Sequence, residues 1–165
     1  ARDLVEGMLQ AASAKRPSAM RAYSHLFFWS RAKRLQFLMD TSDAIEAREQ
    51  EDGLVQALNR RGKKVFGVSW EGQIEAELLL DLGARRKYDY GQVCHLLRAI
   101  RNKKSHYYDL SEGVRALLGS MPEGYVEYWA SRYPLLLMEV HNALSDFGRK
   151  SELPHALKHY FESDA

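Results

Sequence analysis

Apolar side chains recur at every third or fourth position along most of the chain, which is the spacing of amphipathic helices. The longest such stretch is residues 31–49, preceded by Ser30, a residue type that favours the N-cap of a helix. A helix over this stretch turns one stripe of side chains inward: Leu35, Leu38, Ser42 and Ile45. A second amphipathic helix is predicted over residues 91–107.

Capping and turn-forming residues divide the rest of the chain into further predicted helices. Asp52 can cap a helix over residues 53–61, and Gly62 is expected to end it in a left-handed turn. Residues 76–82 predict another helix, which Gly83 would stop. The remaining predicted helices lie at residues 1–11 and after Pro17–Ser18, Ser111, Pro122, Pro134 and Pro154.

Only residues 63–70, KKVFGVSW, have a strand-like composition, and this segment is too short to define a sheet. We therefore predict an all-α fold, a compact bundle of roughly eight helices with at most one short strand-like segment. The 165 residues are enough for one well-packed domain, and the 45% hydrophobic and 28% charged fractions are those of a soluble globular protein.

Composition also excludes several classes of protein. No apolar run approaches the roughly 18–20 residues that span a bilayer, and no signal-peptide pattern opens the chain. The single cysteine, Cys94, cannot form an internal disulfide and indicates a reducing compartment. The first residue is Ala and not Met, so we expect a piece of a longer protein.

Charge is distributed unevenly along the sequence, although the net charge is only +2. Residues 85–106 hold seven lysines and arginines against one acidic residue, whereas residues 40–52 hold six carboxylates and one arginine. A basic patch on a nearly neutral protein is typical of a local polyanion site. Charge blocks of this size also occur on plain solvated faces, so both interpretations stay open.

The helix predicted over residues 91–107 gathers its polar groups on one side. At about 100° per residue, the core stripe consists of Val93, Leu96, Leu97 and Ile100. A separate arc of about 140° carries Arg98, Arg101, Asn102, Ser105 and His106. An arginine fork suits a phosphate and an imidazole can move a proton, so this face fits acid–base chemistry at a phosphodiester. The alternative is that the arginines only make the helix surface soluble, and that the histidine only interacts favourably with the helix dipole at its C-terminus.

Two tyrosines, Tyr88 and Tyr90, lie in a basic turn just before this helix. A tyrosine can stack on a base, donate to a phosphate oxygen or take part in proton transfer. The alternative is that both rings only pack against the following helix, which is our interpretation for Tyr90.

Three segments, LLRAIRNKKSHYYDL, SHLFFWSRAKRLQFLMDTSDAIE and GSMPEGYVEYWASRYPLLL, resemble the kinase-extension nuclease domain. That domain ends the inositol-requiring kinase/endoribonuclease of the unfolded protein response, and a more distant version occurs in ribonuclease L. The resemblance covers residues 27 to about 161 in the right order. The spacing and the rather complete RNKK motif favour the unfolded-protein-response enzyme over ribonuclease L.

The resemblance implies a role for each residue that matches the family's motif. It places the catalytic histidine at His106, the catalytic tyrosine at Tyr88 and the phosphate-gripping arginine at Arg101. Its asparagine matches Asn102. Ser105 stands where the family usually has a bulky aromatic residue or histidine, a departure that concerns substrate contacts and not the proton carrier. The residues expected to contact RNA or phosphate are Lys103, Lys104, Arg98, Ser105 and Arg86.

The first residues resemble the last helices of a protein-kinase lobe, where a D-L-x-x-x-M-L stretch precedes K-R-P-S and H-P-F-F. Leu26 replaces the proline of that ending, and the glutamate that pairs with the arginine matching Arg16 is lacking. The chain has no glycine-rich loop, HRD or DFG, so phosphotransfer is excluded. We therefore expect a kinase-lobe stub at residues 1–28 and a nuclease domain at residues 29–165.

The resemblance further implies metal-independent cleavage of RNA. The ribose 2′-hydroxyl would attack the adjacent phosphorus, leaving a 2′,3′-cyclic phosphate and a 5′-hydroxyl. His106 would be the acid, Tyr88 the base or 2′-hydroxyl positioner, and Arg101 the stabiliser of the phosphorane. No cofactor is expected for RNA cleavage, since ATP and magnesium would serve only the kinase domain of the parent. His155 and His159 are spaced to share a zinc, but their motif offers no further ligand, so we expect no metal site.

Partners and cellular place also follow from the resemblance. We expect stem-loop RNA as substrate, cleaved for RNA splicing or RNA decay, and a homodimer or higher oligomer formed through the parent protein. The parent would hold the domain at the cytosolic face of the endoplasmic reticulum membrane, while this fragment is itself soluble and makes no direct membrane contact. Two alternatives stay open: a catalytically silent RNA-binding module and a dimerisation module of a receptor kinase.

Overall fold

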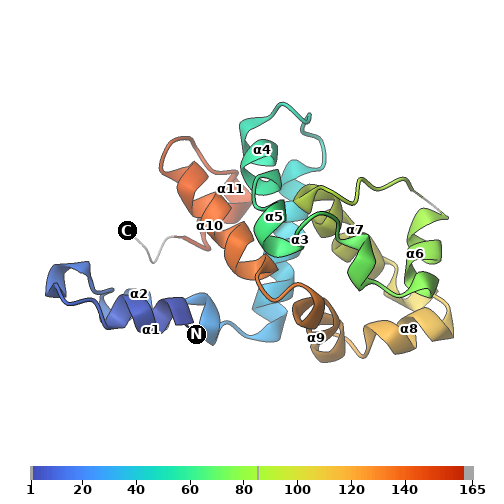
Figure 1. The fold of residues 1–165 in the computed structure, drawn as a ribbon, viewed down its shortest axis with the longest axis horizontal. Coiled ribbons are helices and arrows are strands. Elements are labelled where there is room, and N and C mark those ends of the chain that lie inside the picture. The colour runs from blue at the N-terminus through green and yellow to red at the C-terminus, as the bar shows by residue number, and fades with distance from the viewer. Residues whose placement is uncertain (1, 85, 162–165) are drawn as a thin grey trace.

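The computed structural model describes residues 2–84 and 86–161, and these residues form helices and connecting loops without any strand (Figure 1). The predicted all-α fold is therefore confirmed. Where roughly eight helices were predicted, the described residues form eleven, since several are short: α1 Arg2–Met8, α2 Ala19–Tyr23, α3 Arg31–Ile45, α4 Gly53–Asn59, α5 Gly62–Val65, α6 Ala76–Gly83, α7 Val93–Ser105, α8 Glu112–Leu118, α9 Glu123–Arg132, α10 Leu136–Gly148 and α11 His155–Lys158. Four 3-10 turns join them: η1 Ser13–Lys15, η2 Leu26–Phe28, η3 Glu71–Gln73 and η4 Tyr107–Asp109.

Several helices begin at the residues predicted from the sequence, and a side chain caps each of these starts. The Ser30 hydroxyl accepts from the backbone N–H of Lys33 at 3.2 Å at the start of α3. Asp52 accepts from Leu54 at 2.8 Å at the start of α4, and Ser18 and Ser111 cap α2 and α8 in the same way. Each cap satisfies backbone donors that would otherwise lack partners at a helix start.

The strand-like interpretation of residues 63–70 is wrong, and so is the left-handed turn expected at Gly62. Helix α4 already ends at Asn59, and Gly62 begins the one-turn helix α5. A Cβ at Gly62 would lie 3.0 Å from the ring of Phe66, so this glycine permits a close approach of the ring and not a left-handed turn. Among the described residues no strand lies beside this eight-residue segment, and it buries Val65, Phe66 and Trp70 from a helical turn and loop instead.

Helix α3 is the centre of the fold, with α7 packed along it and α9, α10 and α11 against its other sides. Its buried residues lie on more than the predicted stripe, because Phe37, Met39 and Thr41 are buried as well as Leu35, Ser42 and Ile45. Leu38, the fourth member of that stripe, is only half-buried. Four neighbouring helices contact α3 on several sides, which explains this wider burial, while Gln36 and Asp43 stay exposed.

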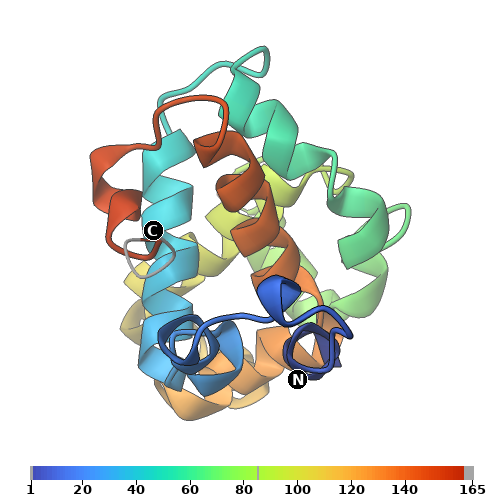
Figure 2. The same cartoon turned by 90° about the vertical axis from the view of Figure 1, so that its left-hand side faces the viewer.

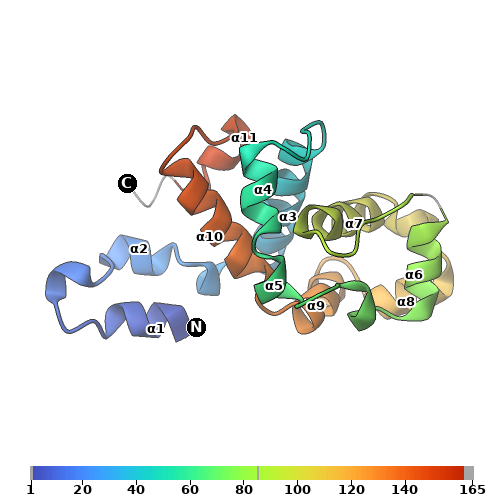
Figure 3. The same cartoon turned by 45° about the horizontal axis from the view of Figure 1, so that its top comes forward.

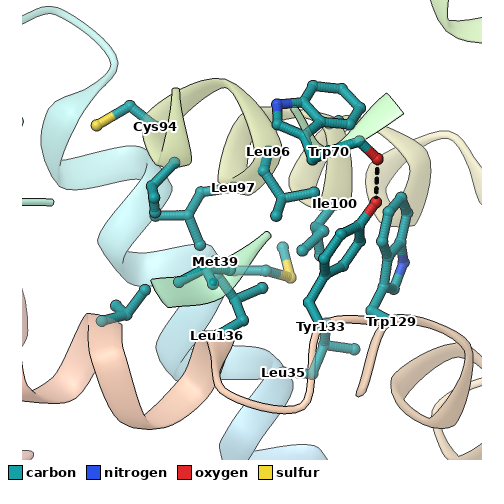
Figure 4. Packing of buried hydrophobic residues seen from close by; sticks show 14 of the residues in the cluster. Leu35, Met39, Trp70, Cys94, Leu96, Leu97, Ile100, Trp129, Tyr133 and Leu136 are labelled. Atoms are coloured by element: carbon teal, nitrogen blue, oxygen red, sulfur yellow. Dashed lines mark hydrogen bonds between the residues drawn. The ribbon is translucent and has the colours of Figure 1, made fainter. Parts of the chain in front are cut away.

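The predicted core stripe of α7 is confirmed, since Val93, Leu96, Leu97 and Ile100 are all at most 1% exposed. Figure 4 shows Leu97 and Ile100 facing Leu35, Met39 and Leu136 from α3 and α10, beside Trp70, Trp129 and Tyr133. The Tyr133 hydroxyl donates to the Trp70 carbonyl, which ties the loop after α5 to α9. This packing fixes the axis of α7, from which most of the candidate site projects.

The two ends of the molecule are well separated. Helices α1 and α2 run side by side at one end, and α6 and α8 lie at the opposite end (Figures 1 and 3). Figure 2 views the molecule from the α1–α2 end. A 3.0 Å contact joins Asp3 of α1 to His25, the N-cap residue of η2. Within the described ranges, no helix combines the length and apolar character needed to cross a membrane.

Candidate functional site

A cavity of about 220 Å³ opens where the end of α6, the loop before α7 and the last turn of α7 meet. It brings together six polar residues singled out from the sequence: Arg86, Tyr88, Arg101, Asn102, Lys103 and His106. Leu82 and Leu110 complete its lining. The four residues expected to be catalytic therefore share one cavity, although Tyr88 comes from a loop and the others from the end of α7.

Aromatic packing beneath the loop holds Tyr88 at the cavity. The buried Trp70 ring meets Tyr88 and Tyr90 edge-on, with ring centroids 6.0 Å and 4.6 Å away. The Trp70 backbone N–H also donates to the Tyr90 carbonyl at 3.0 Å. The Tyr90 ring has a packing role, as predicted, although it packs against Trp70 and not against the face of α7. Tyr88 keeps its hydroxyl at the cavity.

A chain of hydrogen bonds links the polar groups of the cavity. The Asn102 side-chain amide donates to the Tyr88 hydroxyl at 3.0 Å. Arg101 donates from Nη2 to the carbonyl oxygen of the same amide at 3.3 Å. Asn102 therefore uses both ends of its amide, and it couples the orientation of the phenol to that of the guanidinium.

Carboxylates at the end of α3 meet the arginines of α7 and the preceding loop. Arg101 contacts Asp43 at 2.8 Å and Glu46 at 3.0 Å. Arg98 and Arg86 also contact Glu46, at 3.0 Å and 3.2 Å. Burial opposes the charge of Glu46, but the guanidiniums of Arg101 and Arg98 outweigh it and hold the pKa of this carboxyl below its usual range.

His106 ends α7 and leads into η4, and its side chain is 59% exposed. Its Nδ1 lies 3.3 Å from an Asp109 carboxylate oxygen, and Nε2 makes no hydrogen bond to any of the described residues. The Asp109 carboxylate therefore engages one ring nitrogen and favours one orientation of the imidazole. The other nitrogen is then available to a ligand.

The residues expected to contact RNA or phosphate divide into two groups. Arg86 and Lys103 line the cavity, whereas Arg98, Lys104 and Ser105 do not. The Lys103 side chain is only 8% exposed and forms an ion pair with Asp81 of α6, so its charge is largely compensated within the protein. Ser105 is exposed and Lys104 is half-buried, both on the last turn of α7.

Sequence reasoning missed the acidic partners in this site, mainly Asp43 and Glu46. The signal that could have found them was present, because the acidic block at 40–52 and the basic block at 85–106 are complementary in charge. We interpreted each block alone. Packing of α3 along α7 brings them together.

Metal-binding groups do not gather in the part of the chain that the structure describes, where no three His, Cys, Asp or Glu side chains are placed to hold an ion. His155 and His159 both lie at α11, and the His159 ring rests against Tyr160 with centroids 3.9 Å apart. The cavity at the end of α7 is lined instead by side chains that can transfer a proton, such as His106, or that carry a positive charge, such as Arg101.

A family model described as Ribonuclease 2-5A matches residues 34–161, a range that contains the whole cavity. The class that the fold and the site define is therefore a helical ribonuclease domain. The resemblance found in the sequence is confirmed by this match.

Curated relatives agree with this class. The chain is 44% identical over 151 residues to the human "Serine/threonine-protein kinase/endoribonuclease IRE2", covering 92% of the chain and 16% of that relative. It is 41% identical over 158 residues to the "Serine/threonine-protein kinase/endoribonuclease IRE1" of Oryza sativa, covering 96% and 17%. The "Sensor for unfolded proteins in the ER ire1" of Schizosaccharomyces pombe is 38% identical over 148 residues, covering 88% and 14%. The chain belongs to the Ribonuclease 2-5A family, and it spans 14–17% of the length of these three relatives.

Proposed function

We propose that this chain is the endoribonuclease domain of an unfolded-protein-response kinase/endoribonuclease, and that it cleaves RNA by transesterification without a metal ion. The observation that carries the proposal is the single cavity shared by a tyrosine, an amide, an arginine and a histidine. The names of the relatives, which include endoribonuclease, support the same activity.

The reaction begins when a ribose 2′-hydroxyl attacks the adjacent phosphorus, and it ends when the 5′-oxygen leaves. Tyr88, held by Asn102 at 3.0 Å, orients the 2′-hydroxyl or takes its proton. Asn102 itself holds the ribose or the phosphate. The products are a 2′,3′-cyclic phosphate on one fragment and a 5′-hydroxyl on the other.

Charge and proton supply come from the end of α7. Arg101 faces the negative charge that gathers on the phosphorane oxygens, and its planar fork suits two of them. His106 donates a proton from Nε2 to the leaving 5′-oxygen, while Asp109 holds the ring through Nδ1. No cofactor takes part in this scheme, and ATP and magnesium would serve only the kinase domain of a longer parent.

The wider setting is also part of the proposal. The substrate is stem-loop RNA, read by its shape and its unstacked loop bases, for splicing or decay. The active species is a homodimer or higher oligomer formed through the parent, at the cytosolic face of the endoplasmic reticulum membrane. The name of the fission-yeast relative, a sensor in that compartment, supports this location.

Residues 1–28 are proposed to be the end of a kinase lobe, with the nuclease domain following from residue 29. Large apolar side chains on this segment are at least half exposed: Val5, Met8, Leu9, Met20 and Tyr23. Side chains of this kind clustered on one short segment are typical of a surface that another part of a protein covers.

End-group analysis of cleaved stem-loop RNA tests the proposed function. We expect 2′,3′-cyclic phosphate and 5′-hydroxyl ends, formed at the same rate with and without EDTA, because protons and Arg101 replace a metal ion in this scheme. A substrate with a 2′-deoxy residue at the cleavage site is the matched control, and it should stay intact.

Other results would contradict the proposal in distinguishable ways. Loss of cleavage in EDTA would indicate a metal-dependent reaction. Salt-dependent RNA binding without cleavage would indicate the catalytically silent module. Absence of both would favour a domain that serves only in dimerisation.

A further inference from the structure

One carboxylate, that of Glu46, forms ion pairs with three arginines beside the cavity. Glu46 follows the last residue of α3, and its side chain is 33% exposed. Its Oε1 accepts from Arg86 at 3.2 Å, and its Oε2 lies 3.0 Å from both Arg98 and Arg101. These arginines come from the loop before α7 and from two successive turns of α7, so Glu46 joins three separate parts of the site.

The contact with Arg101 reaches the centre of the cavity through two further hydrogen bonds. Arg101 donates to Asn102 at 3.3 Å, and Asn102 donates to the Tyr88 hydroxyl at 3.0 Å. The Arg101 side chain is only 16% exposed, compared with 45% for Arg86. The Arg101 side chain is long and flexible, but these contacts hold its guanidinium in one orientation at the cavity.

Three guanidiniums this close together repel one another, so their inward orientation needs an anion between them. Asp43 contributes only to Arg101 and its side chain is 61% exposed, which makes it the weaker constraint. Without the Glu46 carboxylate, the three guanidiniums would be more stable apart from one another and solvated by water than held together beside the cavity. The arginines would then turn outward, and Asn102 would lose the partner that fixes its amide.

We propose that Glu46 is a positioning residue of the nuclease site, which orients Arg101 and, through Asn102, Tyr88, without touching the RNA itself. This inference rests on the proposed function. Glu46 also reduces the positive charge that attracts RNA, so its effects on catalysis and on binding have opposite signs. Removal of the charge should therefore slow turnover while binding stays the same or becomes tighter.

The test compares Glu46→Gln with Glu51→Gln by steady-state cleavage of one stem-loop RNA at several salt concentrations. Glu51 lies in the same acidic block, is exposed and forms no ion pair with the described residues, so its variant has the same net charge as Glu46→Gln. We expect kcat of Glu46→Gln to fall on the order of 10- to 100-fold, because a catalytic group displaced by about 1 Å can cost this much. The KM of this variant should be unchanged or lower and should depend more steeply on salt.

Two further measurements separate positioning from a structural role. Both variants should keep the thermal unfolding midpoint of the parent to within a few degrees. Water still reaches the Glu46 carboxylate, which is 33% exposed, and screened ion pairs contribute little stability. Glu46→Asp keeps the charge and should recover part of the lost kcat. A neutral substitution that acted only by loosening the fold would lower the unfolding midpoint and raise KM along with the loss of kcat.

The outcomes distinguish this inference from the function on which it rests. If the parent and Glu51→Gln cleave RNA and Glu46→Gln has the same kcat, the positioning role is wrong and the proposed function stands. An equal loss in both variants would assign the effect to net charge and would also overturn it. A parent that does not cleave overturns the proposed function, and this inference with it.

Discussion

The two halves of helix α7 are built on different principles. Its first turns, from Val93 to Ile100, lie in the core and are fixed by packing against α3 and α10. Its C-terminal part, from Arg101 to the C-cap His106, carries polar groups fixed by hydrogen bonds and ion pairs to α3, the preceding loop and η4. The buried half sets where the helix lies, and the charged half sets how its side chains point. A substitution in one half should therefore affect stability, and in the other half catalysis.

The largest expected effect is on catalysis, from His106→Ala. We expect the rate of RNA cleavage to fall by about two to four orders of magnitude, because the leaving oxygen loses its proton donor. The unfolding midpoint should hardly change, since the side chain is 59% exposed. His155→Ala is the matched control, because His155 is an exposed histidine on α11 outside the cavity. Cleavage by His106→Ala at the parental rate would show that the histidine has another role.

In the buried half, Leu97→Ala should act on stability. Leu97 is fully buried, so truncation leaves a void among the side chains of α3 and α10. We expect the free energy of unfolding to fall by about 2–5 kcal/mol in denaturant titrations. Lys104→Ala, on the last turn of the same helix and half-buried, should change it by less than about 0.5 kcal/mol. Equal losses in the two variants would contradict the division of the helix.

The smallest expected effect is the loss of stability in acid, when Glu46 takes up a proton and its ion pairs with the arginines weaken. The pKa of Glu46 is lowered from its usual value of 4.5, because the arginines outweigh the effect of burial. A carboxyl with a lowered pKa stabilises the fold at higher pH, and this contribution is lost as the pH falls through the folded-state pKa. We expect the parent to lose more stability than Glu46→Gln in chemical denaturation as the pH falls below the usual carboxyl value of 4.5. Identical pH profiles would show that the carboxylate is not held by its arginines.

Much of the fold could be predicted because helical periodicity is a property of short stretches of sequence. The core stripe of α7, the cap residues Ser30 and Asp52 and the polar face of α7 all follow from local spacing. Residues 63–70 show the limit of this reasoning. Apolar and β-branched residues favour a strand, but a strand needs a partner, and no partner lies beside this segment among the described residues.

Local spacing along the chain was enough to predict most of the helices, the buried face of α7 and the residue types on the opposite face. The contacts of Glu46 with Arg86, Arg98 and Arg101, and the burial of Lys103 against Asp81, depend instead on how the helices pack. The physical reason is that a helix presents its own faces wherever it lies, whereas an ion pair between α3 and α7 exists only once packing has brought the two helices together.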